Sequence, residues 1–356
     1  MIPLFKVGMA EDASSRVSKV LSSGFIGQGP VVEEFEDLLK KELKTDTRPV
    51  TVNSCTSAID LALELIGIGS DDEVIATPQT CFASNVHIIH RKARIRWADI
   101  DPITGLIDPK SVENLITSKT KAIVAVNWAG KFADYATLKK FNVPVIEDAA
   151  HTWDIFLKEK VERGDYICYS FQAIKFLTTS DGGILICPKE KEAEARVLRW
   201  YGLDRTKNES FRCTQNITKV GFKYHMNDVC ASIGISNIPT ARNSVNASRS
   251  NAKYIIENVS NKNLITPYWD TTCSYWLFSM HCLDNKNKFI DYLNTHGIGN
   301  SPVHYRNDLY DCTIKFKEKE LSGVTSFDKT QICIPNGWWV DQQQLDHIVK
   351  VLNSYT

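Results

Sequence analysis

The runs VPVIED at residues 143–148 and YICYSFQAIK at residues 166–175 decide the fold class of this chain. Each run starts with a short apolar segment, and the charged residues Asp148 and Lys175 stand at their ends. Short apolar runs of this kind are typical of the buried strands of a parallel sheet. Because functional side chains of such sheets gather at the carboxyl ends of the strands, the two runs predict a carboxylate and an amine at one sheet edge.

Outward from these two runs, strand-like segments alternate with helical ones. A helix is expected to begin at Pro109, with Asp108 as its N-cap. Together with the two runs above, the strand-like segments predict an α/β fold with a mainly parallel, seven-stranded sheet that is covered on both faces. The further strands are expected at residues 50–52, 73–77, 94–98, 121–126 and 183–187.

The pattern of elements changes near Arg242. From there we expect a helix at 242–259, a strand at 275–283, a helix at 285–296, a strand at 331–334 and a last helix from Asp341. This order predicts two domains, a large α/β domain at residues 1–241 and a smaller C-terminal α+β domain at residues 242–356.

Composition excludes several classes of protein. The chain has 42 Lys and Arg against 42 Asp and Glu, so no net charge favours nucleic acid or an anionic membrane as a partner. No apolar run approaches the ~20 residues that span a bilayer, and the N-terminus does not resemble a signal peptide. Ten cysteines are scattered without paired spacing, and Cys187 and Cys333 lie in apolar runs. We therefore expect free thiols, no metal site and a cytoplasmic location.

The setting of Lys175 indicates chemistry. Its neighbours Ile174 and Phe176 are apolar, and burial among such residues would lower the pKa of the lysine and free its amine for a Schiff base. A surface lysine with its head group in water is the alternative. Asp148 could pair with a buried cation at the sheet edge, or it could cap the helix that follows.

The segment SCTS at residues 54–57 follows a strand and opens a helix. Backbone N–H and hydroxyl groups at a helix start bind phosphate well, although an ordinary helix cap has the same appearance. This segment, Asp148 and Lys175 follow one another in the order of a pyridoxal 5'-phosphate (PLP) site in a fold-type I aminotransferase. Asp148 would keep the pyridine nitrogen protonated, and Lys175 would form the Schiff base and move the proton.

The sequence also resembles the DegT/DnrJ/EryC1/StrS family of sugar aminotransferases over essentially its whole length. The segments that carry the resemblance stand in family order, and they are IPLFKV, SSGFIGQGPVVEEFE, VNSCTSAIDLAL, DEVIATPQTCFAS, TKAIVAVNWAGKFAD, VIEDAAH, SFQAIKFLTTSDGG, RWYGLDR, GFKYHMNDVCASIG and VHYRNDLY.

The resemblance implies a role for each residue at a family position. Lys175 would hold the cofactor and Asp148 would pair with its ring nitrogen. His151 would lie near the ring oxygen, and Phe82 would stack on the ring. Lys223 would reach the phosphate of the neighbouring subunit, which implies a homodimer with active sites at the interface. The phosphate would be held by Cys55, Thr56 and Ser170, and substrate contacts are expected from Gly27, Arg205, His225, His304 and Arg306.

Two residues depart from the family pattern. Cys55 replaces the usual glycine, which we expect to be tolerated if its φ is negative. Lys223 stands where many members have asparagine, and its charge should tighten the binding of phosphate. Some relatives carry histidine in place of the lysine and catalyse dehydration, so Lys175 favours transamination.

The expected reaction moves the amino group of L-glutamate onto a nucleoside-diphosphate 4-keto-6-deoxyhexose, which gives a 4-amino-4,6-dideoxy sugar nucleotide. Three alternatives stay open: amination of a 3-keto sugar, a PLP-dependent sugar dehydratase or lyase, and a regulator that keeps the fold without catalysis.

Overall fold

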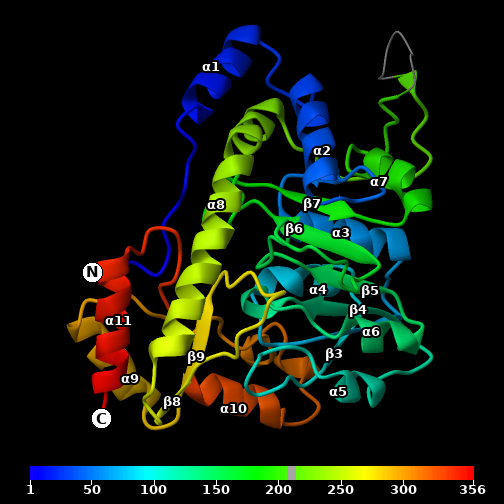
Figure 1. The fold of residues 1–356 in the computed structure, drawn as a ribbon. Helices are drawn as coiled ribbons and strands as arrows, with labels where there is room; N and C mark the ends of the chain where they lie inside the picture. The colour runs from blue at the N-terminus through cyan, green and yellow to red at the C-terminus, as the bar shows by residue number, and fades with distance from the viewer. Residues whose placement is uncertain (207–213) are drawn as a thin grey trace.

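The computed structural model of this chain describes residues 1–206 and 214–356. A seven-stranded sheet forms the centre of the larger part of the molecule (Figure 1). Its strand order is β1-β7-β6-β5-β4-β2-β3, and all neighbours from β6 to β3 are parallel. Only β7 runs antiparallel to its neighbours β1 and β6. The strands are β1 (Val50–Val52), β2 (Glu73–Ala76), β3 (Arg94–Trp97), β4 (Thr120–Val126), β5 (Val145–Asp148), β6 (Tyr166–Ser170) and β7 (Gly183–Ile186).

Helices cover both faces of this sheet, as the near-continuous burial of its strands requires. One apolar cluster joins the sheet to α3 and α4, and another joins it to α2 and to the long helix α8. These findings confirm the predicted fold class. The helices of this part are α1 (Ala13–Ser23), α2 (Pro30–Glu42), α3 (Cys55–Ile66), α4 (Val86–His90), α5 (Pro109–Glu113), α6 (Tyr135–Leu138), α7 (Glu192–Leu198) and α8 (Asp228–Asn258).

The C-terminal part has its own antiparallel sheet, in the order β10-β9-β8, and its own apolar cluster. Asn285 and Asp341 cap its helices α9 and α11 at the predicted positions. The elements of this part are β8 (Leu264–Ile265), β9 (Phe278–Cys282), α9 (Lys286–Thr295), α10 (Ser322–Thr330), β10 (Gln331–Ile334) and α11 (Gln342–Ser354).

The structure differs from the predicted domain organisation at two places. Helix α8 runs without interruption from Asp228 to Asn258, so the boundary expected at residues 241/242 falls inside it. Figure 1 shows α8 passing from the level of the large sheet to the C-terminal part. The N-terminal arm, residues 1–10, does not belong to the large part alone, as predicted: Leu4 and Phe5 pack against the apolar cluster of the large sheet, whereas the start of the arm joins the C-terminal part. Ile2 is buried in its apolar cluster, and the Ile2 amide donates to the carbonyl of Gly297 at 2.7 Å.

Nine cysteines in the described ranges are free, and Cys81 and Cys312 are the exposed ones among them. Cys213 lies outside the described residues. Among the helices of the described ranges, none combines the length and the apolar character that a membrane crossing needs. Within these same ranges, no group of His, Cys, Asp or Glu side chains has the arrangement of a metal site.

Candidate active site

Asp148 and Lys175 come together at the carboxyl ends of the parallel strands β5 and β6 of the large sheet. Asp148 is the last residue of β5 and pairs with Cys168 of the adjacent parallel strand β6, and Lys175 follows in the turn after β6. Burial lowers the pKa of Lys175 from 10.5 to about 8, while the nearby Asp148 acts to raise it. The amine therefore holds its proton less tightly than an exposed lysine does, as the apolar neighbours in the sequence predicted.

Donors from three separate segments hold the Asp148 carboxylate. The Ser84 hydroxyl donates to Oδ2 at 2.6 Å, the Ala150 amide donates to Oδ1 at 3.0 Å, and the Cys55 thiol contacts Oδ1 at 3.8 Å. Burial raises the pKa of Asp148, and these hydrogen bonds and the charge of Lys175 oppose that rise. The carboxylate has one orientation as a result. Sequence reasoning missed Ser84, because nothing in the local pattern of η1 (Phe82–Ser84) marks it.

The start of α3 is a capped helix N-terminus, at the place where the sequence predicts the phosphate site. Ser54 is the N-cap, and its hydroxyl accepts from the Ser57 amide at 3.0 Å. Cys55 lies in the first turn of the helix with a buried side chain and without a positive φ, which meets the condition stated for its tolerance. A Cβ atom at Gly183 would lie 2.7 Å from the Cys55 nitrogen, so only glycine lets β7 approach this turn so closely.

The other residues expected at the cofactor lie on segments that meet these two groups. Ser170 ends β6, five residues before Lys175, and Thr56 follows Cys55 in the first turn of α3. Phe82 is only partly buried, and its ring packs against Tyr310 with a centroid distance of 5.2 Å.

A group of aromatic rings stands beside Lys175. The His151 ring stacks on Trp276 with a centroid distance of 4.2 Å, and it lies 6.2 Å from the ring of His304. Burial and the charge of Lys175 lower the pKa of both histidines, that of His304 to about 4. The Nε2 atom of His304 is buried without a hydrogen-bond partner. Trp276 was not among the predicted site residues, because SYWLF reads as an ordinary buried strand.

Three predicted substrate residues, His225, His304 and Arg306, are basic types that would suit a phosphate, and the structure corrects that expectation. His304 and His225 are neutral at pH 7, because burial and nearby positive charges lower the pKa of each to about 4. The guanidinium of Arg306 is buried, and it donates to Asp308 at 2.7 Å and to the Thr325 hydroxyl at 2.8 Å. None of these side chains offers a free positive charge to a phosphate group.

Arg205, Lys223 and His225 form a second cluster around Trp200. The His225 ring packs on Trp200 with a centroid distance of 3.5 Å, and the Arg205 guanidinium lies 4.4 Å from the Trp200 ring. Lys223 is exposed, and its carbonyl accepts from Asn53 at 3.3 Å. This bond places the cluster next to the turn at the start of α3. Gly27 is also exposed, and its carbonyl accepts from the Asp228 amide at 2.8 Å.

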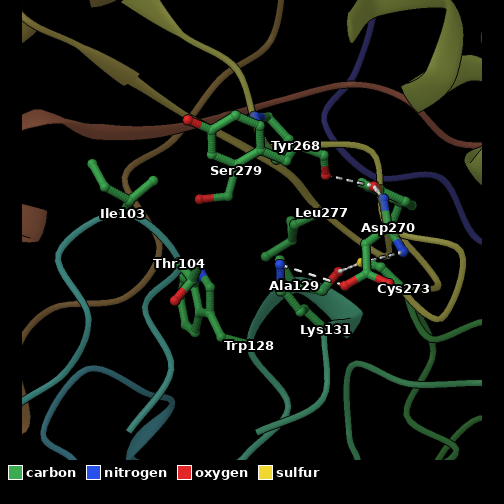
Figure 2. Close-up of a pocket in the computed structure, with 12 residues that line it drawn as sticks. Ile103, Thr104, Trp128, Ala129, Lys131, Tyr268, Asp270, Cys273, Leu277 and Ser279 are labelled. Carbon is green, nitrogen blue, oxygen red and sulfur yellow. Dashed lines mark hydrogen bonds and ion pairs between the residues drawn. The ribbon is translucent and has the colours of Figure 1, made fainter. Parts of the chain in front are cut away.

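A separate apolar pocket lies at the junction of the two parts of the chain (Figure 2). Its two charged lining residues, Lys131 and Asp270, form an ion pair of 3.4 Å. Trp128 belongs both to the wall of this pocket and to the ring group, since its ring meets His151 edge-on at 5.6 Å. The pocket contains no acid or base that is free for catalysis.

The residues at the carboxyl ends of the parallel strands fit the predicted cofactor. PLP requires an amine for its aldehyde, a fixed carboxylate for its ring nitrogen and a cradle for its phosphate. Lys175, Asp148 and the turn that begins at Ser54 supply these groups. Gly183 lets β7 pack directly against the backbone of this turn, where a Cβ atom would clash.

Comparison with known proteins defines the class of this protein. The profile of the DegT/DnrJ/EryC1/StrS aminotransferase family matches residues 8–353, so the chain belongs to that family. This result confirms the resemblance seen in the sequence motifs.

Three solved structures are similar to the chain. The sugar aminotransferase CalS13 from Micromonospora echinospora is 30% identical with a TM-score of 0.92, and the match covers 100% of both chains. AtS13 from Actinomadura melliaura is 33% identical with a TM-score of 0.91, covering 100% of this chain and 99% of that one. Spr1654 from Streptococcus pneumoniae, a putative sugar aminotransferase in its PLP form, is 23% identical with a TM-score of 0.89 over 99% of this chain and 98% of that one. PLP is thus the cofactor of a solved protein with this fold, in agreement with the predicted cofactor.

Proposed function

We propose that this protein is a PLP-dependent aminotransferase that moves the amino group of L-glutamate onto a nucleoside-diphosphate 4-keto-6-deoxyhexose. The product would be a 4-amino-4,6-dideoxy sugar nucleotide. The observation that carries the proposal is the enclosed pair of Lys175 and Asp148, in a chain that belongs to a family of sugar aminotransferases.

When bound, the cofactor supplies the electron sink that lets a proton leave the carbon next to the transferred nitrogen. Lys175 would hold the aldehyde carbon through its Nζ atom and afterwards carry the proton. With a pKa of about 8, roughly a tenth of its amine is uncharged at pH 7, so it can both accept and return a proton. Asp148 would hold a proton on the ring nitrogen, and its donors keep the carboxylate in place for that task.

The neutral histidines suit a sugar better than a phosphate. The Nε2 atom of His304 is buried and has no partner, so a substrate hydroxyl or keto oxygen would satisfy it. Lys223 and Arg205 carry positive charges beside the rings of Tyr201 and Trp200, in the cluster that contacts Asn53 just before α3. In this proposal they face the phosphates of the cofactor or the sugar nucleotide, with Gly27 nearby, and Lys223 serves the neighbouring subunit of a homodimer. The free thiols of the described cysteines agree with a reducing, cytoplasmic environment.

The test is to incubate the purified protein with PLP, L-glutamate and a panel of nucleotide keto sugars. Mass spectrometry should detect an amino sugar nucleotide together with 2-oxoglutarate. NMR of the product should place the nitrogen on carbon 4. A 3-amino product would select the 3-keto alternative, a deoxy product without nitrogen would indicate a dehydratase, and no reaction with any sugar would favour a regulator.

A further inference from the structure

The head group of Lys175 lies on the face of Trp276. The distance from the Lys175 Nζ atom to the centroid of the ring is 3.4 Å. An ammonium group within about 6 Å of an aromatic centroid is attracted by the electron-rich face, most strongly when water is excluded. Trp276 is buried, and only 8% of its surface is exposed. The Trp276 ring, which lies just before β9, therefore provides a defined binding position for the amine.

Three contacts fix the plane of the Trp276 ring. Its Nε1 atom donates to the carbonyl of Ile174, the residue before Lys175, at 3.0 Å. Phe5 stacks on the ring with a centroid distance of 5.3 Å and an interplanar angle of 27°, and His151 stacks on it with an angle of 24°. The hydrogen bond holds the Nε1 edge of the ring, and the stacking of Phe5 and His151 holds its plane. The ring therefore cannot turn away from Lys175 without breaking these contacts.

Phe5 belongs to the N-terminal arm, and hydrogen bonds hold this arm both before and after Phe5. The carbonyl of Pro3 accepts from the Trp339 ring nitrogen at 2.8 Å, and the Ala10 amide donates to Asn237 on α8 at 2.8 Å. Phe5 and Trp276 also line one small cavity together with Lys175. The arm thus forms part of the wall of the active site.

We propose that Trp276, held in place by Phe5, is a positioning residue that receives the head group of Lys175 whenever this lysine is not bonded to the cofactor. During each catalytic cycle the amine of Lys175 has to leave the cofactor and return to it. The face of Trp276 stabilises the released amine in its charged form and keeps it within the site. This inference rests on the proposed role of Lys175, and it adds two residues to which no role was assigned.

The pKa of Lys175 in the cofactor-free protein is the property to measure. The groups that face its amine are Asp148 from β5, Cys55 from α3, Cys81 from the segment before η1, and the neutral rings of His151 and His304. A tryptophan face favours the ammonium form and thus raises the pKa of the lysine. Trp276→Leu should remove this effect, whereas Trp276→Phe should keep most of it with a side chain of similar apolar character.

The experiment follows the rate at which the cofactor-free, full-length protein captures PLP, by absorbance, as a function of pH. Only the uncharged amine reacts, so the midpoint of the profile reports the pKa of Lys175. We expect the midpoint of Trp276→Leu to lie about half a unit to one unit below that of Trp276→Phe. Phe5→Ala should shift the midpoint in the same direction by a smaller amount. The double variant Phe5→Ala, Trp276→Leu should have the same midpoint as Trp276→Leu alone, because Phe5 acts only through the position of Trp276.

Thermal unfolding of each variant serves as the control for folding, and Phe5→Ala provides the test if Trp276→Leu does not fold. Equal midpoints for the leucine and phenylalanine variants would overturn the inference, as would fully additive effects of Phe5 and Trp276. Failure of the unmodified protein to capture PLP on Lys175 would instead contradict the proposed function. The two failures are therefore distinguishable.

Discussion

The hydroxyl of Ser84 donates a 2.6 Å hydrogen bond to Oδ2 of Asp148, and both residues are buried. This bond connects η1 to the end of β5 and fixes one oxygen of the carboxylate that we propose pairs with the cofactor ring. Ser84 also shares a hydrogen bond with the Thr80 hydroxyl at 2.9 Å, which limits the rotation of its own side chain.

The first prediction concerns this bond. Ser84→Ala should weaken PLP binding or lower turnover by roughly tenfold to a hundredfold, because a hydrogen bond to a charged group contributes about 1.5–3 kcal/mol. Absorbance titration with PLP and steady-state kinetics measure the two effects. Ser84→Thr keeps the hydroxyl and is the matched control. Unchanged binding and turnover in Ser84→Ala would show that the bond is dispensable.

The second prediction concerns Lys175. Lys175→Ala should fold, but it should lose both turnover and the covalent link to PLP that borohydride can reduce. The reason is that the amine beside Asp148 is the one whose pKa burial lowers to about 8. Borohydride treatment of the unmodified protein with PLP, followed by peptide mapping, checks the assignment. A label on any other lysine would disprove it.

The third prediction concerns Asp148. Asp148→Asn should lower turnover by orders of magnitude while some cofactor stays bound, since a neutral amide cannot hold a proton on the ring nitrogen. Kinetics with saturating PLP separate this effect from loss of the cofactor. Near-normal turnover of the asparagine variant would mean that the role of Asp148 is different.

The fourth prediction concerns pH and stability. In the cofactor-free protein the pKa of Lys175 is lowered from 10.5 to about 8, so between these values the unfolded chain binds more protons than the folded one. The free energy of unfolding should therefore gain a favourable contribution from this residue as pH rises from about 8 to 10.5. Urea unfolding across this range, compared with Lys175→Met, isolates the contribution. Parallel pH profiles for the two proteins would contradict the lowered pKa.

The fifth prediction concerns assembly. If Lys223 serves the cofactor of a neighbouring subunit, the active protein must be at least a dimer in sedimentation. Mixing inactive Lys175→Ala with weakened Lys223→Ala should restore activity, because each hybrid dimer contains one site with both lysines intact. An active monomer, or a mixture no more active than its components, would exclude the shared site. Lys175→Ala mixed with a double Lys175→Ala, Lys223→Ala variant is the negative control.

Much of the fold follows from local patterns in the chain. The runs at residues 143–148 and 166–175 contain β5 and β6, which end at Asp148 and Ser170. The caps Asp108, Asn285 and Asp341 begin helices where the sequence places them. Such features depend on hydrophobic periodicity and on single side chains near a helix start, which are local properties.

Other features depend on contacts between distant segments, and local patterns do not reveal them. The arm that carries Ile2 and Phe5 packs on the C-terminal part, some 300 residues away along the chain, where Ile2 pairs with Ile298. The charge states of His225 and His304 depend on burial by the whole fold, and the Arg306 guanidinium, which pairs with its near neighbour Asp308, is also bound by the more distant Thr325 hydroxyl.

The sequence by itself therefore determined the α/β class and most of the order of elements, and it marked Asp148 and Lys175 at the ends of two strand-like runs, because each of these follows from a short run of residues and its spacing. Only the tertiary structure decided that Ser84 orients Asp148, that Trp276 lies beneath the amine of Lys175, and that Arg306 is already neutralised. The physical reason is that hydrogen bonds, stacking and desolvation act over a few ångströms in space, whatever the distance along the chain.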